Sequence, residues 1–99
     1  MASPEDCNSL HDVRAGIDRL DREIIERLAE RGRYVHAAAR FKTSEAQVAA
    51  PERQKAMLAV RREWAAAEGL DPDVIEDIYR RIVAYFIQRE LDHWRAPKA

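Results

Sequence analysis

The sequence predicts a small all-α protein with three helices in a single domain, and two observations support this. Apolar residues recur at spacings of three and four along three segments, and no segment shows the strict alternation of apolar and polar residues that indicates a strand. The chain has 99 residues, of which 46% are hydrophobic and 35% charged. That composition is enough for one domain, residues 1–99, with a core of its own.

The first predicted helix begins at SLHD, where Ser9 can cap it and Asp12 can complete a capping box. We expect it to run to about Lys42, which makes it roughly 50 Å long at 1.5 Å per residue. A compact monomer of this size has a radius of gyration of about 13 Å, so two shorter helices cannot cover such a length. We therefore expect an intertwined homodimer. The apolar stripe of this helix comprises Leu10, Val13, Ile17, Leu20, Ile24, Leu28, Val35 and Ala38.

The second and third helices are bounded by proline and glycine. The second begins at Pro51 and ends near Gly69, a residue type that favours the left-handed position after a helix. The third begins with Asp71 as its N-cap and Pro72 in its first turn, and continues to about Trp94. Their apolar residues are Met57, Leu58, Val60 and Trp64 in the second helix, and Ile75, Ile78, Ile82, Val83, Phe86 and Ile87 in the third.

The composition argues against several classes of function. The net charge is −1 and basic residues are interleaved with acidic ones, which disfavours a nucleic-acid partner. Cys7 is the only cysteine, and the histidines have no metal-ligand spacing, so we expect no metal site and plain surface or packing roles for His11, His36 and His93. The glycines form no phosphate-binding loop, and we expect no cofactor. No apolar run is long enough to span a membrane, and no signal peptide is apparent, so a cytoplasmic location is expected.

Charged residues occupy positions where the helical stripes call for apolar ones. On the first helix, continuing the stripe beyond Leu28 reaches Arg31 and Lys42, and Arg14 lies beside the same stripe. On the third helix, the inner face leads to Glu90. These charges could be neutralised within the protein, by an ion pair of Glu90 with Arg31 or Lys42. Alternatively, the long basic side chains could lie along the core and keep their charged ends in water. Three cations against one acid instead favour a site for a small dianionic molecule, because arginine binds carboxylates in a bidentate manner.

These residues resemble the all-helical chorismate mutase family. The resemblance extends over the whole chain: Arg14 and Arg31 lie on a long first helix, Lys42 at its end, Arg53 at the start of the second and a polar residue at position 90. Within the family, the segments most similar to the isochorismate pyruvate lyases are PEDC at 4–7, RFKTSEAQVAAPER at 40–53, EGLD at 68–71 and HWR at 93–95. Those lyases make salicylate for siderophore biosynthesis.

The resemblance implies a fold, a reaction and a set of residues. Family members are intertwined homodimers, in which Arg14 would reach into the partner's site. Arg31, Lys42 and Arg53 would bind the two carboxylates and the ether oxygen of isochorismate or chorismate. Lys42, Glu90 and Arg31 are the candidate catalytic residues, and the candidate substrate-binding set also includes Gln54 and Val35. Both family reactions are pericyclic and need no cofactor, so catalysis depends on conformer selection and charge stabilisation.

Three positions bear on which reaction is catalysed. Family mutases commonly carry acids near the arginine of the second helix, where this chain has Ala50 and Gln54, and this favours the lyase. The lyases usually have Gln where this chain has Glu90, so we expect Glu90 to act as a neutral donor and kcat/KM to rise below neutral pH. Chorismate mutase, as the main or a weak side activity, and a non-catalytic helical dimer remain alternatives. We also expect the segment between Lys42 and Arg53 to be mobile without ligand and ordered around a di-acid.

Overall fold

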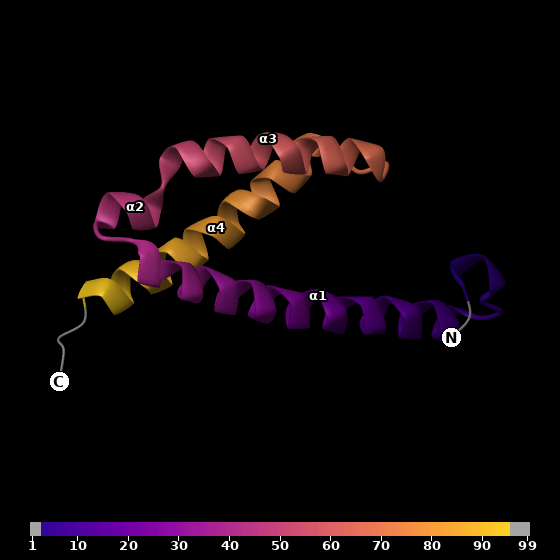
Figure 1. Cartoon of the computed structure of the whole chain (residues 1–99). Helices are drawn as coiled ribbons and strands as arrows, with labels where there is room; N and C mark the ends of the chain where they lie inside the picture. Colours follow the sequence, from indigo (N-terminus) through magenta and orange to yellow (C-terminus); the bar gives the residue numbers. More distant parts are fainter. Residues whose placement is uncertain (1–2, 96–99) are drawn as a thin grey trace. The chain divides into compact units, whose positions relative to one another are not determined.

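The computed structural model describes residues 3–95 and is helical throughout this range, apart from short connections (Figure 1). The elements are, in order, η1 (Pro4–Asp6), α1 (Leu10–Ala38), η2 (Ala39–Phe41), α2 (Glu45–Ala49), α3 (Pro51–Ala67) and α4 (Pro72–Arg95). The predicted all-α fold with a very long first helix is confirmed. The short helix α2 is an addition to the three that the sequence predicted.

Helix α1 begins with the predicted cap. The Ser9 hydroxyl accepts a hydrogen bond from the backbone N–H of Asp12 at 3.1 Å, and the Asp12 carboxylate accepts one from the N–H of Asn8 at 3.3 Å. Its 29 residues make it about 44 Å long. None of its residues is buried, and its stripe is at least 40% exposed at Leu10, Val13, Ile17, Leu20 and Ile24. The compact unit to which most of α1 belongs, up to Val35, contains no second α-helix among its described residues that could cover this apolar face.

The first helix ends in a 3₁₀ turn just before Lys42. The α-helix stops at Ala38, the single 3₁₀ turn η2 follows, and Lys42 already has extended backbone angles of φ −106° and ψ 135°. The prediction that the helix runs to about Lys42 is confirmed, since α1 and η2 together extend from Leu10 to Phe41 before the chain becomes extended. The cause is the beginning of α2: Ser44 is its N-cap, and the Ser44 hydroxyl accepts a hydrogen bond from the Gln47 N–H at 3.2 Å. An N-cap requires extended backbone, which ends the preceding helix.

Two turns with left-handed backbone join the remaining helices. Ala50, between α2 and α3, has φ 42° and ψ 60°, an uncommon conformation for a residue with a Cβ atom. Gly69, after α3, has φ 75°, and the N–H of Leu70 bonds the carbonyl of Ala65 at 2.8 Å. That bond is the mark of a Schellman motif and confirms the predicted end of the helix. Asp71 then caps α4 through a 2.9 Å bond from the Asp73 N–H, as predicted.

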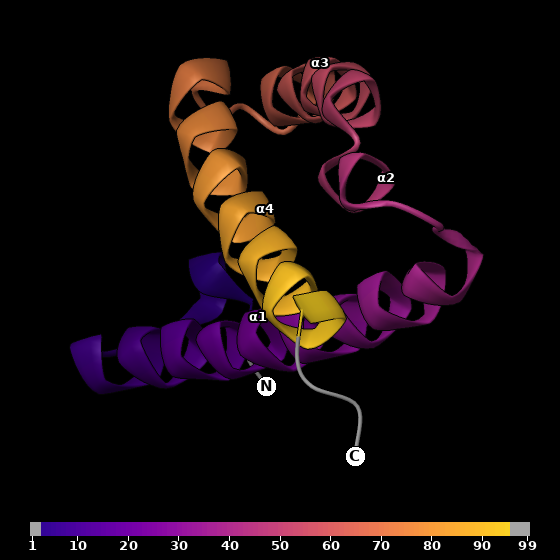
Figure 2. The same cartoon turned by 90° about the vertical axis from the view of Figure 1, so that its left-hand side faces the viewer.

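The core lies between α3 and α4. Figure 2 shows α3 nearly end-on and α4 along its length, so these two helices cross. Helix α2 also packs on α4. The buried hydrophobic residues are Val48 of α2, Met57, Leu58 and Ala65 of α3, and Val83 and Phe86 of α4. Over residues 3–95, none of the helices combines the length and apolar character needed to cross a bilayer.

Candidate active site

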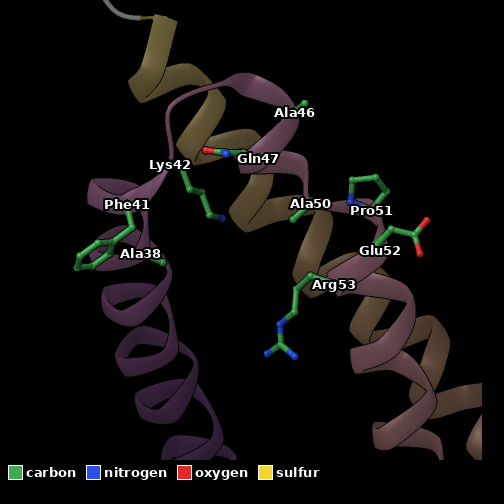
Figure 3. Close-up of a pocket in the computed structure, with 9 residues that line it drawn as sticks. All are labelled: Ala38, Phe41, Lys42, Ala46, Gln47, Ala50, Pro51, Glu52 and Arg53. Carbon is green, nitrogen blue, oxygen red and sulfur yellow. The ribbon is translucent and has the colours of Figure 1, made fainter.

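A pocket of about 620 Å³ opens where the end of the first helical segment, α2 and the first turn of α3 meet (Figure 3). Its size is in the range of small-molecule sites. It is lined by Ala38, Phe41, Lys42, Ala46, Gln47, Ala50, Pro51, Glu52 and Arg53. The structure thus places Lys42 and Arg53, two of the candidate site residues, in the lining of one pocket.

The two cations extend into the same space, and no acid among residues 3–95 forms an ion pair with either of them. In Figure 3 the Lys42 ammonium and the Arg53 guanidinium both extend toward the space between their elements, and the Glu52 carboxylate lies on the other side of α3. Within residues 3–95, neither Lys42 nor Arg53 forms a hydrogen bond or ion pair through its side chain. Lys42 is half-buried and Arg53 exposed. A pocket with uncompensated positive charge favours an anionic guest.

The local backbone explains why Arg53 reaches this pocket. The left-handed turn at Ala50 redirects the chain, and Pro51 then begins α3 without losing a helical hydrogen bond, because its missing N–H would be unpaired there. Arg53 follows in the first turn. Gln54, the next residue, is half-buried and does not line the pocket, although it was a candidate for substrate binding.

Gln47 is a pocket residue that the sequence analysis missed. Its Oε1 accepts hydrogen bonds from the backbone N–H of Thr43 and from the Thr43 hydroxyl, the latter at 3.1 Å. With Oε1 held in this way, its amide NH₂ is left as a donor beside Lys42 (Figure 3). A signal was present in the sequence, since Ser44 followed three residues later by Gln47 matches a capping box.

Glu90 lies on α4 and has a partner that the sequence did not suggest. Its side chain is 11% exposed, and its Oε1 lies 3.1 Å from Nδ1 of His36, at the end of α1. Its Oε2 is buried and has no hydrogen-bond partner within the described residues. Of the internal ion pairs that the sequence suggested for Glu90, the one with Lys42 is not found within residues 3–95. His36, which was expected to be a plain surface or packing residue, contacts a candidate catalytic group instead.

The remaining candidates lie on α1. Arg14 is exposed, whereas Arg31 and Val35 are half-buried. Arg31 has an interaction with another group, so it is not a free cation. The predicted roles of these three residues in a substrate site, like the donation of Arg14 across a dimer interface, stay predictions.

The helical fold and the cationic pocket define a class of protein, and comparison with known families identifies it. The profile of type II chorismate mutases matches residues 13–91, and the chain belongs to this family. The match covers most of α1 and continues to the last turns of α4.

Individual relatives narrow the comparison. The chain is 45% identical over 95 residues to the isochorismate pyruvate lyase of Pseudomonas aeruginosa, a match that covers 96% of this chain and 94% of that protein. It is 41% identical over 76 residues to the T-protein of Haemophilus influenzae and 38% identical over 72 residues to that of Enterobacter agglomerans. These matches cover 76% and 72% of this chain, but only 20% and 19% of the T-proteins.

Proposed function

We propose that the protein is an isochorismate pyruvate lyase, which converts isochorismate to salicylate and pyruvate. The observation that carries the proposal is the pocket in which Lys42 and Arg53 present two cations that form no ion pair within residues 3–95. Isochorismate carries two carboxylates, so its charge suits such a pocket. The near full-length similarity to a lyase of this name supports the choice of substrate.

The proposed reaction needs a held conformation and stabilised charge rather than a nucleophile. The C–O bond between the ring and the enolpyruvyl group breaks, and a ring hydrogen moves to the methylene carbon of that group. The side chain leaves as pyruvate and the ring becomes salicylate, so atoms and electrons balance. Arg31 and Arg53 would hold the carboxylates, and Lys42 would stabilise negative charge on the departing ether oxygen. Arg31 takes this role from the family resemblance.

A homodimer is part of the proposal, with Arg14 of each chain completing the site of its partner. The uncovered stripe of α1 supports it, because exposed apolar surface of this extent is typical of an interface. Sedimentation equilibrium tests the dimer. Mixing Arg14→Ala with Lys42→Met chains tests the donation: one site of a mixed dimer would hold both defects and the other neither. Partial recovery of activity is expected, and its absence from verified mixed dimers would contradict a shared site.

Glu90 would act as a neutral hydrogen-bond donor to the ether oxygen, because an ionised carboxylate would repel the substrate. We expect kcat/KM to rise as pH falls below neutrality. Glu90→Gln supplies a donor at every pH and should raise neutral activity and flatten the profile. An unchanged profile in this variant would refute the role.

Chorismate mutase is the second candidate, favoured by the family to which the chain belongs. Ala50 allows the two reactions to be separated, since Asp and Asn tolerate the left-handed backbone found there. The double variant Ala50→Asp, Gln54→Glu should raise the ratio of mutase to lyase activity at least about tenfold, which corresponds to 1.4 kcal/mol. Ala50→Asn is the matched control, because it has the shape of Asp without the charge.

One assay decides among the activities. Purified protein is given isochorismate, with salicylate fluorescence as the readout, and separately chorismate, with prephenate as the readout. Salicylate and pyruvate in equal amounts support the lyase, and prephenate at the higher kcat/KM supports the mutase. If neither substrate gives product from mildly acidic to mildly basic pH, the third candidate is favoured. This candidate is a non-catalytic helical dimer that binds a partner or a small di-acid.

A further inference from the structure

The two oxygens of the Glu90 carboxyl group have different surroundings. Oε1 is 3.1 Å from Nδ1 of His36, and Oε2 is buried without a hydrogen-bond partner in residues 3–95. The two side chains also differ in exposure, at 11% for Glu90 and 61% for His36. A partly solvated ring therefore holds one oxygen of a nearly buried carboxyl group, and the other oxygen is buried without a partner in residues 3–95.

We propose that His36 is a positioning residue for Glu90. It donates its Nδ1–H to Oε1, so that the proton of the neutral carboxyl group is carried by Oε2, the oxygen free to donate to the substrate. The inference rests on the proposed function, because it assigns Oε2 to the ether oxygen of isochorismate. The opposite arrangement, with Oε1–H donating to Nδ1, would use the carboxyl proton within the protein and leave Oε2 as an acceptor only.

The described groups around His36 do not compete with Glu90 for its Nδ1 atom. The ring of His93 on α4 meets the His36 ring edge-on, with centroids 5.1 Å apart and planes at 72°. Arg40 of η2 lines the same surface recess of about 440 Å³, together with Ala39 and Trp94. His93 packs against the imidazole without bonding Glu90, and no second acid in the described residues competes for Nδ1. His36 is thus the side chain that fixes which carboxyl oxygen is occupied.

Two substitutions of His36 separate the effect of its hydrogen bond to Glu90 from the effects of its packing and its charge. His36→Asn places an amide NH₂ as many bonds from Cα as Nδ1, so it keeps the donor and loses the ionisable ring. His36→Leu keeps the bulk and removes the donor. His93→Phe is the matched control in the same recess, because it keeps an aromatic edge against His36 and makes no bond to Glu90.

We expect kcat for isochorismate to fall about tenfold or more in His36→Leu, with KM little changed, since misplacing a catalytic group slows the chemical step. His36→Asn should stay within about threefold of the wild type, and so should His93→Phe. A kcat in His36→Leu equal to that of the wild type would overturn the positioning role, and so would an equal loss in His36→Asn.

Tautomer measurements test the contact without turnover. Two-bond ¹H–¹⁵N correlation spectra at mildly basic pH should show the neutral His36 ring protonated on Nδ1 in the wild type. Glu90→Leu should shift the population toward the Nε2–H form, which predominates in free imidazole side chains. A wild-type ring in the Nε2–H form would overturn the inference even if the lyase activity is present. If a wild type with the Nδ1–H form turns over neither substrate, the proposed function is refuted, and with it the positioning role of His36 in catalysis, while the contact with Glu90 stays established.

Discussion

Val48 anchors the helix that borders the candidate active site. It is the buried residue of α2, at 4% exposure, and α2 packs on α4. Val48→Ala removes two methyl groups, each worth about 0.8 kcal/mol of burial, so detachment of α2 should become easier by about 1.6 kcal/mol. Because 1.4 kcal/mol is a factor of ten, the detached population should rise about 15-fold.

Native-state hydrogen exchange measures this population at the amide of Ala50, whose N–H bonds the Ala46 carbonyl at 2.8 Å. We expect its exchange to speed up about 15-fold in Val48→Ala, and to slow again when a dianionic substrate or product analogue is added. Val60→Ala is the matched control, since Val60 on α3 is exposed. Unchanged exchange at Ala50 would refute the anchoring role. Equal acceleration at Leu58, in the middle of α3, would show that α2 opens only with global unfolding.

Three further predictions concern the core, the Glu45–Arg95 pair and the pocket. Met57→Ala should lower the free energy of unfolding in urea by about 2–5 kcal/mol, because Met57 is 2% exposed, and a loss below about 1 kcal/mol would contradict its place in the core. Hydrogen bonds from Arg95, at 2.7 and 3.0 Å, lower the pKa of Glu45 below its ordinary value of 4.5. A depressed folded-state pKa gives stability that is present above pH 4.5 and is lost as pH falls through the lower folded value. The hydrogen-exchange protection of the α2 amides, corrected for intrinsic exchange rates, should therefore decline in acid in the wild type. The same protection should not decline in Glu45→Gln. Lys42→Met should lower kcat/KM for isochorismate by about 10²–10³, while Lys55→Met on the exposed side of α3 should not, and equal losses would argue against a local role for Lys42.

The features that the sequence predicted correctly are local ones. The caps at Ser9 and Asp71 and the turn at Gly69 depend on residues within a few positions of each other, and all three occur as expected. Lys42 and Arg53 also line one pocket, because only a short connection separates them in the chain.

The features that were missed have two physical causes. Helix α2 has five residues, which is too short for a hydrophobic period to appear, and only its cap could have indicated it. The contact of His36 with Glu90 joins residues 54 positions apart. No spacing rule within one helix reports on such a pair, since it depends on how two helices pack.

The Schellman turn at Gly69 has a consequence for the order in which the chain folds. It joins the two helices that supply every buried hydrophobic residue of the described chain except Val48. A hairpin of neighbouring helices has low contact order, so its core can form on the fast timescale of helical bundles. Helix α1 has no buried residue whose burial would offset the entropy cost of forming the helix. It gains stability only when another surface packs on its apolar stripe. Refolding should therefore show a rapid phase independent of protein concentration, followed by a phase for α1 that accelerates with concentration if a second copy provides the cover.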